Sequence, residues 1–148
     1  MRTQLKWTKY LIIIQIDGYG VWNWEEAESP EGRGGGEALA AEYLHKKGYE
    51  VLEANYHHVH REIDFIVQKD DCVAFVEVKT RSSDAILEAP LAVGRRKQMF
   101  LFSAASRFLA QRRVGDCEVR FDIVWVETEG ADMHVVSHIE GAFTPFGG

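Results

Sequence analysis

The segment EIDFIVQKDDCVAFVEVKT, residues 62–80, reads as two strands joined by a tight turn, and it decides the fold. Both runs are rich in β-branched and aromatic residues, and the aspartates at 70 and 71 mark a turn between them. If these aspartates form a two-residue loop, Lys69 pairs with Cys72 and the register follows along both strands. One face of the hairpin is then wholly apolar, with the opposed pairs Ile63 and Val78, Phe65 and Val76, and Val67 and Ala74. The pattern favours this register or one shifted by two residues, because a one-residue shift would exchange the faces of one strand.

Polar residues on the other face of the hairpin gather at the end away from the turn. In this register Asp64 opposes Glu77, and Glu62 opposes Lys79. Opposed residues have Cβ atoms about 4.5–5.5 Å apart, and like charges at that separation destabilise a sheet. A divalent cation between Asp64 and Glu77 removes the repulsion, and oxygen ligands suit Mg²⁺ or Mn²⁺ rather than zinc. An exposed sheet edge at which Glu77 and Lys79 simply pair explains the same spacing equally well.

The remaining elements lie on either side of this hairpin in the sequence. Strong helix formers in GEALAAEYLHKKGY predict a helix that stops near Gly48. A second helix fits the row of Leu101, Ala105 and Phe108. The expected elements are a helix over 36–48, a strand over 49–58, the hairpin, a helix over 90–113, and strands over 118–127 and 133–139. This α-β-β-β-α-β-β order predicts an α/β fold with a central mixed sheet flanked by helices.

The 148 residues, of which 46% are hydrophobic, fit one globular domain preceded by an extension. The acidic, turn-forming EEAESPEG and the glycine-rich GRGGG predict an N-terminal extension or linker over residues 1–32, with the domain over 33–148. Cys72 and Cys117 form neither a disulfide framework nor a zinc spacing, which indicates a reducing compartment. The longest aliphatic run, residues 11–14, falls far short of the ~20 residues of a membrane span, so we expect a cytoplasmic protein.

The net charge of −6 conceals a basic middle segment. Residues 77–113 contain eight Lys or Arg against three acids, whereas residues 114–148 contain one Arg against seven acids. A basic segment of this kind can face a polyanion such as nucleic acid, and a solvated helix face explains it equally well. The best candidates for phosphate contact are Arg81, Arg95, Arg96 and Lys97. Contacts of this kind give affinity for a nucleic acid without reading its sequence.

Three other features have an ordinary structural explanation beside a functional one. Glu37, at the start of the first helix, is favoured there by the helix dipole alone. The histidines of NYHHVH, residues 55–60, lack a carboxylate or cysteine spacing that would complete a metal site, so we expect them on the surface. Asp122 lies among apolar neighbours and is expected to pair with Arg120 across one pleat.

Asp64, a gap of twelve residues, and then Glu77-Val78-Lys79 resemble the D-(x)n-E-x-K signature of the restriction-endonuclease-like (PD-(D/E)XK) superfamily. The surrounding motifs are more specific. GEALAAEYL, EIDFIV, FVEVKTR, VGRRK, RFDIV and HIEGAF follow in this order and closely resemble the YraN family, small bacterial proteins described as endonucleases. The resemblance covers about residues 34–143, and several motifs in series are far more specific than a lone E-x-K.

The resemblance implies a restriction-endonuclease-like nuclease domain, similar to archaeal Holliday-junction resolvases, that hydrolyses DNA phosphodiester bonds with Mg²⁺ or Mn²⁺. By analogy its substrate would be branched or structured DNA. Asp64 and Glu77 would bind the metal with the Val78 carbonyl as a further ligand, and Lys79 would orient or deprotonate the attacking water. Glu37 matches an acid that approaches the metal. Lys97 and Gln98 match a position that faces the site. A homodimer is also implied, because resolvase-like relatives dimerise.

The chain departs from the family pattern at Arg61, where the family usually has glycine before the E-I-D motif. An arginine there would either crowd the site or add a phosphate contact. Two alternatives to the nuclease therefore stay open. One is a non-catalytic nucleic-acid-binding protein that retains the nuclease fold. The other is an unrelated α/β binding module in which Asp64, Glu77 and Lys79 form a surface ion network.

Overall fold

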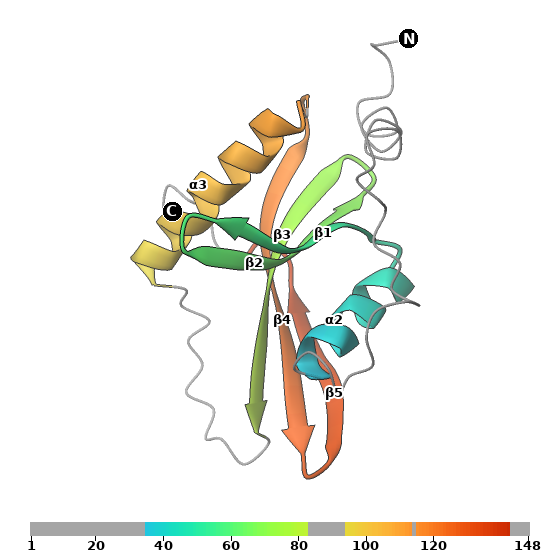
Figure 1. Cartoon of the computed structure of the whole chain (residues 1–148). Helices are drawn as coiled ribbons and strands as arrows, with labels where there is room; N and C mark the ends of the chain where they lie inside the picture. The colour runs from blue at the N-terminus through green and yellow to red at the C-terminus, as the bar shows by residue number, and fades with distance from the viewer. Residues whose placement is uncertain (1–34, 83–93, 114, 143–148) are drawn as a thin grey trace.

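The computed structural model describes residues 35–82, 94–113 and 115–142, in which a five-stranded sheet carries one helix on each face (Figure 1). In chain order the elements are α2 (Gly35–Lys46), β1 (Glu50–His58), β2 (Arg61–Lys69), β3 (Cys72–Ser82), α3 (Arg95–Gln111), β4 (Glu118–Glu129) and β5 (Asp132–Ile139). This order confirms the predicted α/β class and is consistent with a restriction-endonuclease-like fold. The predicted extension over residues 1–32 and the predicted helix start at 90–93 lie outside the described residues.

The strands follow one another across the sheet in the order β1-β2-β3-β4-β5. Neighbouring strands are antiparallel except β3 and β4, which are parallel and therefore need the crossover that contains α3. The two-residue loop between β2 and β3 is confirmed, because Lys69 pairs with Cys72. The register that follows from it is also confirmed as far as the pair of Phe65 with Val76.

The two faces of the sheet carry separate apolar clusters. On one face Ala40, Ala41 and Leu44 of α2 pack against side chains that include Phe65, Val67, Ala74, Val76 and Val124. On the other face the predicted row of Leu101, Ala105 and Phe108 on α3 packs against a set that includes Ile63, Ile66, Phe75, Phe121 and Ile123. No helix in the described ranges is long and apolar enough to cross a membrane.

The strands β2 and β3 separate part of the way along their length. Their paired residues end with Phe65 and Val76, while β3 continues beside β4 to its last residue. In Figure 1, β1 and β2 run together towards the first turn of α3, whereas β3 continues along β4. The predicted direct opposition of Asp64 and Glu77 is therefore not part of the ladder.

The alternation of β2 also breaks at this point. Ile63 packs with Ile66 on the α3 face, whereas Phe65 lies on the α2 face, so the prediction that Ile63 shares an apolar face with Phe65 is wrong. The physical cause lies in β1, where Asn55 has a φ of 52°. The pairs on either side of Asn55 place it opposite Asp64. Asparagine is one of the few residues that tolerate the left-handed conformation, so the two-strand ribbon bends here and the next side chain changes face.

Candidate active site where two strands separate

Asp64 lies half-buried where β2 leaves β3. The Val78 N–H donates a hydrogen bond to its Oδ2 over 2.7 Å. The carboxylate thus takes the place of a backbone partner for an N–H that the β2 ladder no longer reaches. Since the N–H and C=O of one strand residue point to the same side, the Val78 carbonyl also faces Asp64. The structure therefore brings together the carboxylate and the carbonyl that sequence analysis assigned to a metal.

The charge environment of Asp64 is unfavourable to its ionised form. Burial, together with the charges of Glu77 and Glu37, raises the pKa of the Asp64 carboxyl to about 6, although the Val78 hydrogen bond and the Lys97 charge oppose this rise. Glu77 and Glu37 are thus close enough for their charges to act on Asp64. A buried carboxyl with a raised pKa, beside specific charged partners, is typical of a functional site.

Glu77 lies on the α3 side of β3 and contacts two lysines. Its side chain is only 13% exposed, and its Oε1 lies 3.3 Å from Lys97 Nζ and 3.8 Å from Lys79 Nζ. Lys97 belongs to the first turn of α3, so this ion pair joins the helix to the strand. The sequence predicts phosphate contact for Lys97 and contains no signal for its ion pair with Glu77. Only the crossover from β3 to α3 brings the two residues together, and no local pattern signals it.

The first turn of α2 brings Glu37 towards the same point. The helix approaches β3 so closely that a side chain at residue 36 would collide with the Thr80 hydroxyl. Thr80 lies two residues beyond Val78 on β3. A larger residue at position 36 would therefore displace the Thr80 side chain or the helix. The close packing explains why the charge of Glu37 reaches Asp64.

The predicted phosphate-contacting residues divide into two groups. Arg61 and Lys97 both lie over the Phe100 ring, with the guanidinium carbon 5.9 Å and the ammonium nitrogen 5.7 Å from its centre. Arg95 and Arg96 are exposed in the same first turn of α3. Four cations are therefore gathered where the start of β2 meets the first turn of α3, and Arg61 packs on an aromatic ring.

The second group consists of Arg81, which lies apart from these cations, and Gln98, which is partly buried. Arg81 lies over the Trp125 ring at 5.1 Å, and its Nη2 is 3.5 Å from Glu127 Oε2. This arginine is held along β3 and β4 and does not join the basic residues of α3. Gln98 is half-buried on α3, one residue after Lys97.

The donor set at Asp64 fits a magnesium-like ion better than zinc. Within the described ranges, no group of three or more His, Cys, Asp or Glu residues is arranged to hold a metal ion. Mg²⁺ retains several waters and is often held by only one or two carboxylates, whereas protein zinc sites need at least three side-chain ligands. Asp64 and Glu77 supply two carboxylates, a number that fits Mg²⁺ and is too small for zinc.

Fold and site together define an α/β protein of restriction-endonuclease-like architecture with an acidic and lysine cluster where two strands separate. The model of the uncharacterised protein family UPF0102 matches residues 36–126, and the chain belongs to this family, which is the YraN family that its motifs indicate.

Relatives in this family are similar over most of their length. A UPF0102 protein of Trichlorobacter lovleyi is 38% identical over 109 residues, which cover 73% of this chain and 86% of the relative. A UPF0102 protein of Alkaliphilus oremlandii is 40% identical over 110 residues, which cover 73% and 93%. One of Syntrophomonas wolfei is 42% identical over 108 residues, with the same coverage. The names of these relatives state no activity.

Proposed function

We propose that this protein is a metal-dependent endonuclease that hydrolyses phosphodiester bonds in DNA, with branched or structured DNA as the preferred substrate. One observation carries the proposal. The half-buried Asp64 meets the charges of Glu77 and Glu37 where two strands separate, and its pKa rises to about 6 as a result of burial and of those charges. A bound cation would offset the repulsion between these carboxylates. An exposed ion pair with only a structural role would need no such cation.

The residues of the chain would then have distinct roles. Asp64, Glu77 and the Val78 carbonyl would hold Mg²⁺ or Mn²⁺, which when bound supplies Lewis acidity and lowers the pKa of a water ligand. Lys79, whose side chain is 42% exposed, would orient that water and place a positive charge near the scissile phosphate. Glu37 would place a further negative charge near the metal from the opposite side, through the close approach of α2, without joining its ligands.

The basic residues outside this cluster would position the nucleic acid. Arg61 is the first residue of β2, and Arg95 and Arg96 lie in the first turn of α3. The next residue, Lys97, contacts Glu77. Contacts from such side chains to backbone phosphates fix a nucleic acid in place without selecting its sequence. This arrangement favours a substrate chosen by shape.

A specific contact favours a second candidate, a nucleic-acid-binding protein without turnover. The ammonium groups of Lys79 and Lys97 both lie within 4.0 Å of Glu77 Oε1, at 3.8 and 3.3 Å. Glu77 therefore has counter-charges within the chain itself. If these lysines remain paired with Glu77 when a metal is present, Glu77 would not bind the metal. The protein would then bind DNA and leave it intact.

Cleavage assays separate these two functions. We expect the wild-type protein to cut linear duplex, single-stranded or four-way-junction DNA with Mg²⁺ or Mn²⁺, and to cut none of them with EDTA. Asp64→Asn and Lys79→Gln should abolish cutting. Their matched controls, Asp132→Asn and Lys46→Gln, change exposed residues away from the site and should cut like the wild type. Binding without cutting on any substrate would support the second candidate, and absence of binding at low salt would refute both.

A further inference from the structure

The loop between β1 and β2 presents an apolar side chain in an unfavourable backbone conformation. His58 pairs with Arg61, so Val59 and His60 form a two-residue loop. Val59 has a φ of 58° and is 77% exposed. A positive φ at this position favours glycine, asparagine or aspartate, and it is an outlier for a β-branched residue. Since this valine buries little of its surface and strains the turn, it points to a contact outside the fold.

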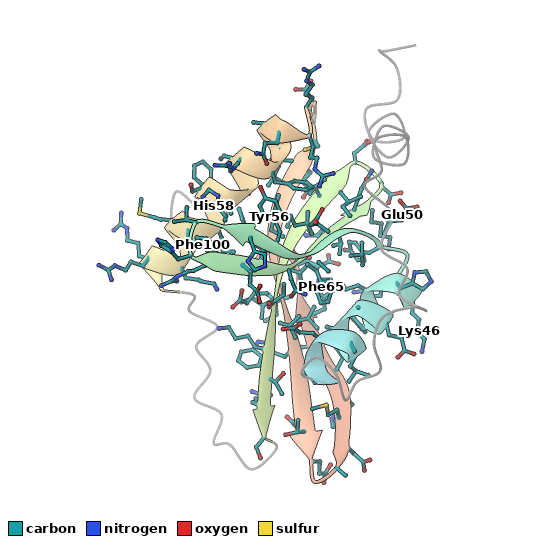
Figure 2. All side chains as sticks on the ribbon, in the orientation of Figure 1. Lys46, Glu50, Tyr56, His58, Phe65 and Phe100 are labelled. Carbon is teal, nitrogen blue, oxygen red and sulfur yellow. The ribbon has the colours of Figure 1, made fainter. Side chains whose placement is uncertain are left out.

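The loop is held in a fixed place against α3. His58 Nε2 lies 3.1 Å from Ser103 Oγ, and the His58 and Phe100 rings are 5.8 Å apart (Figure 2). On the other strand, the Arg61 guanidinium lies over the same Phe100 ring. Both strands that lead into the loop are therefore anchored to one aromatic residue of the helix. The loop therefore presents Val59 at a position that is set by contacts with α3.

The first turns of α3, against which the loop packs, carry exposed positive charge and a second exposed apolar side chain. Arg61, Arg95 and Arg96 are exposed, and Met99, one turn into α3, is 66% exposed. We name Val59, Arg61, Arg95, Arg96 and Met99 the tip surface. Lys97 lies between Phe100, under this surface, and Glu77 of the candidate site. The tip surface is thus connected to the acidic cluster through a single lysine.

An apolar projection among arginines has the chemistry of a nucleic-acid contact. Arginines hold the phosphate backbone, and proteins that deform DNA insert an apolar side chain between base steps and unstack them. We propose that Val59 is a wedge that enters the base stack of DNA next to the candidate site, while Arg61, Arg95 and Arg96 hold the phosphates. This inference rests on the proposed function for its partner, DNA, and does not require hydrolysis.

The test compares fold stability with DNA binding in Val59→Asn and Val59→Gly. Both replacements accept a positive φ, so we expect thermal midpoints equal to or above that of the wild type. The affinity for duplex and four-way-junction DNA should fall about tenfold. DNA that contains 2-aminopurine should brighten with the wild-type protein, because an unstacked base fluoresces more strongly, and should stay dim with both variants. All measurements contain EDTA, so that cleavage does not contribute.

The control is Val119→Ala, which changes another exposed valine, paired with Val73 near the turn between β2 and β3. It should bind and brighten the DNA like the wild type. Binding and brightening that survive in Val59→Asn would overturn the wedge, and so would a wild type that binds without brightening. In either case the proposed function stands if metal-dependent cutting persists. Lower midpoints in both Val59 variants would show that the valine serves the fold and would also overturn the wedge. A wild type that binds no DNA refutes both ideas.

Discussion

Replacing Asp64 by asparagine should stabilise the metal-free protein at neutral pH, although the same change should abolish cleavage. Burial and the charges of Glu77 and Glu37 raise the pKa of Asp64 from 3.8 to about 6 in the folded protein. Each pH unit of difference corresponds to ~1.36 kcal/mol, so ionising Asp64 in the folded state costs about 3 kcal/mol of stability. Asparagine has no charge to bury, and its amide oxygen can still accept the Val78 hydrogen bond.

The sign of the effect follows from proton binding. The folded state holds the Asp64 proton more tightly than the unfolded state does. The stability that the protonated Asp64 carboxyl contributes to the folded state is therefore fully present below pH 3.8. It is lost as the pH rises through about 6. The advantage of asparagine over aspartate should consequently be small near pH 4 and reach about 2–3 kcal/mol by about pH 7.5.

Urea unfolding followed by tryptophan fluorescence, with EDTA present, measures this difference. The free energy of unfolding of wild type and Asp64→Asn would be compared at about pH 4.5 and about pH 7.5, in the range where the Asp64 contribution changes. Asp132→Asn removes an exposed carboxylate and serves as the control. A difference between wild type and Asp64→Asn that is the same at both pH values would refute the charge environment described for the site.

Two further predictions concern the packing around the site and the buried network beyond it. Gly36→Ala should lower the free energy of unfolding by about 1–3 kcal/mol, because the new methyl group collides with the Thr80 hydroxyl; Thr80→Ala in the same chain should recover part of the loss, and an unchanged urea midpoint would contradict this packing. Asp122, 1% exposed, accepts hydrogen bonds from Arg120 at 2.8 and 2.8 Å and from the Gly141 N–H at 3.0 Å, and its Oδ2 lies 2.8 Å from His138 Nε2. Asp122→Ala should therefore cost about 3–5 kcal/mol, since Arg120 would lose its buried partner. The hydrogen bonds of Asp122 hold its pKa below the ordinary value against the effect of burial, so its stabilisation is present above about pH 4 and is lost as the pH falls further; a variant whose deficit persists unchanged at low pH would contradict this.

Local patterns in the sequence were sufficient for the elements and for most of the hairpin register. Alternation excluded a one-residue shift and left two registers open, and a two-residue aspartate loop predicted the pairing that is observed from Lys69 and Cys72 to Phe65 and Val76. The pairing of Asp122 with Arg120 was also predictable, since two residues of one strand separated by one residue share a face.

The parts that were missed depend on contacts that no local pattern contains. Ile63 is apolar, and an apolar residue satisfies either face of a sheet that is covered on both sides, so the sequence pattern did not reveal the change of face. The only local signal was Asn55 in the middle of a strand, where its tolerance of positive φ permits a bend. The contact of Lys97 with Glu77 depends on the path between β3 and α3, which periodicity leaves undetermined.

The bend at Asn55 and Asp64 has two consequences for the structure. It ends the pairing of β2 with β3, so that the Val78 N–H and carbonyl face a carboxylate instead of a neighbouring strand. It also carries the outer ends of β1 and β2 to the first turn of α3, where Phe100 anchors Arg61 and the loop that presents Val59. A straight hairpin would keep its backbone bonds but would provide neither the acidic cluster nor the projecting valine. The hydrogen bonds lost from the ladder and the ionisation cost at Asp64 are together the stability that this chain would give up to place the proposed metal site beside the proposed DNA-contacting surface.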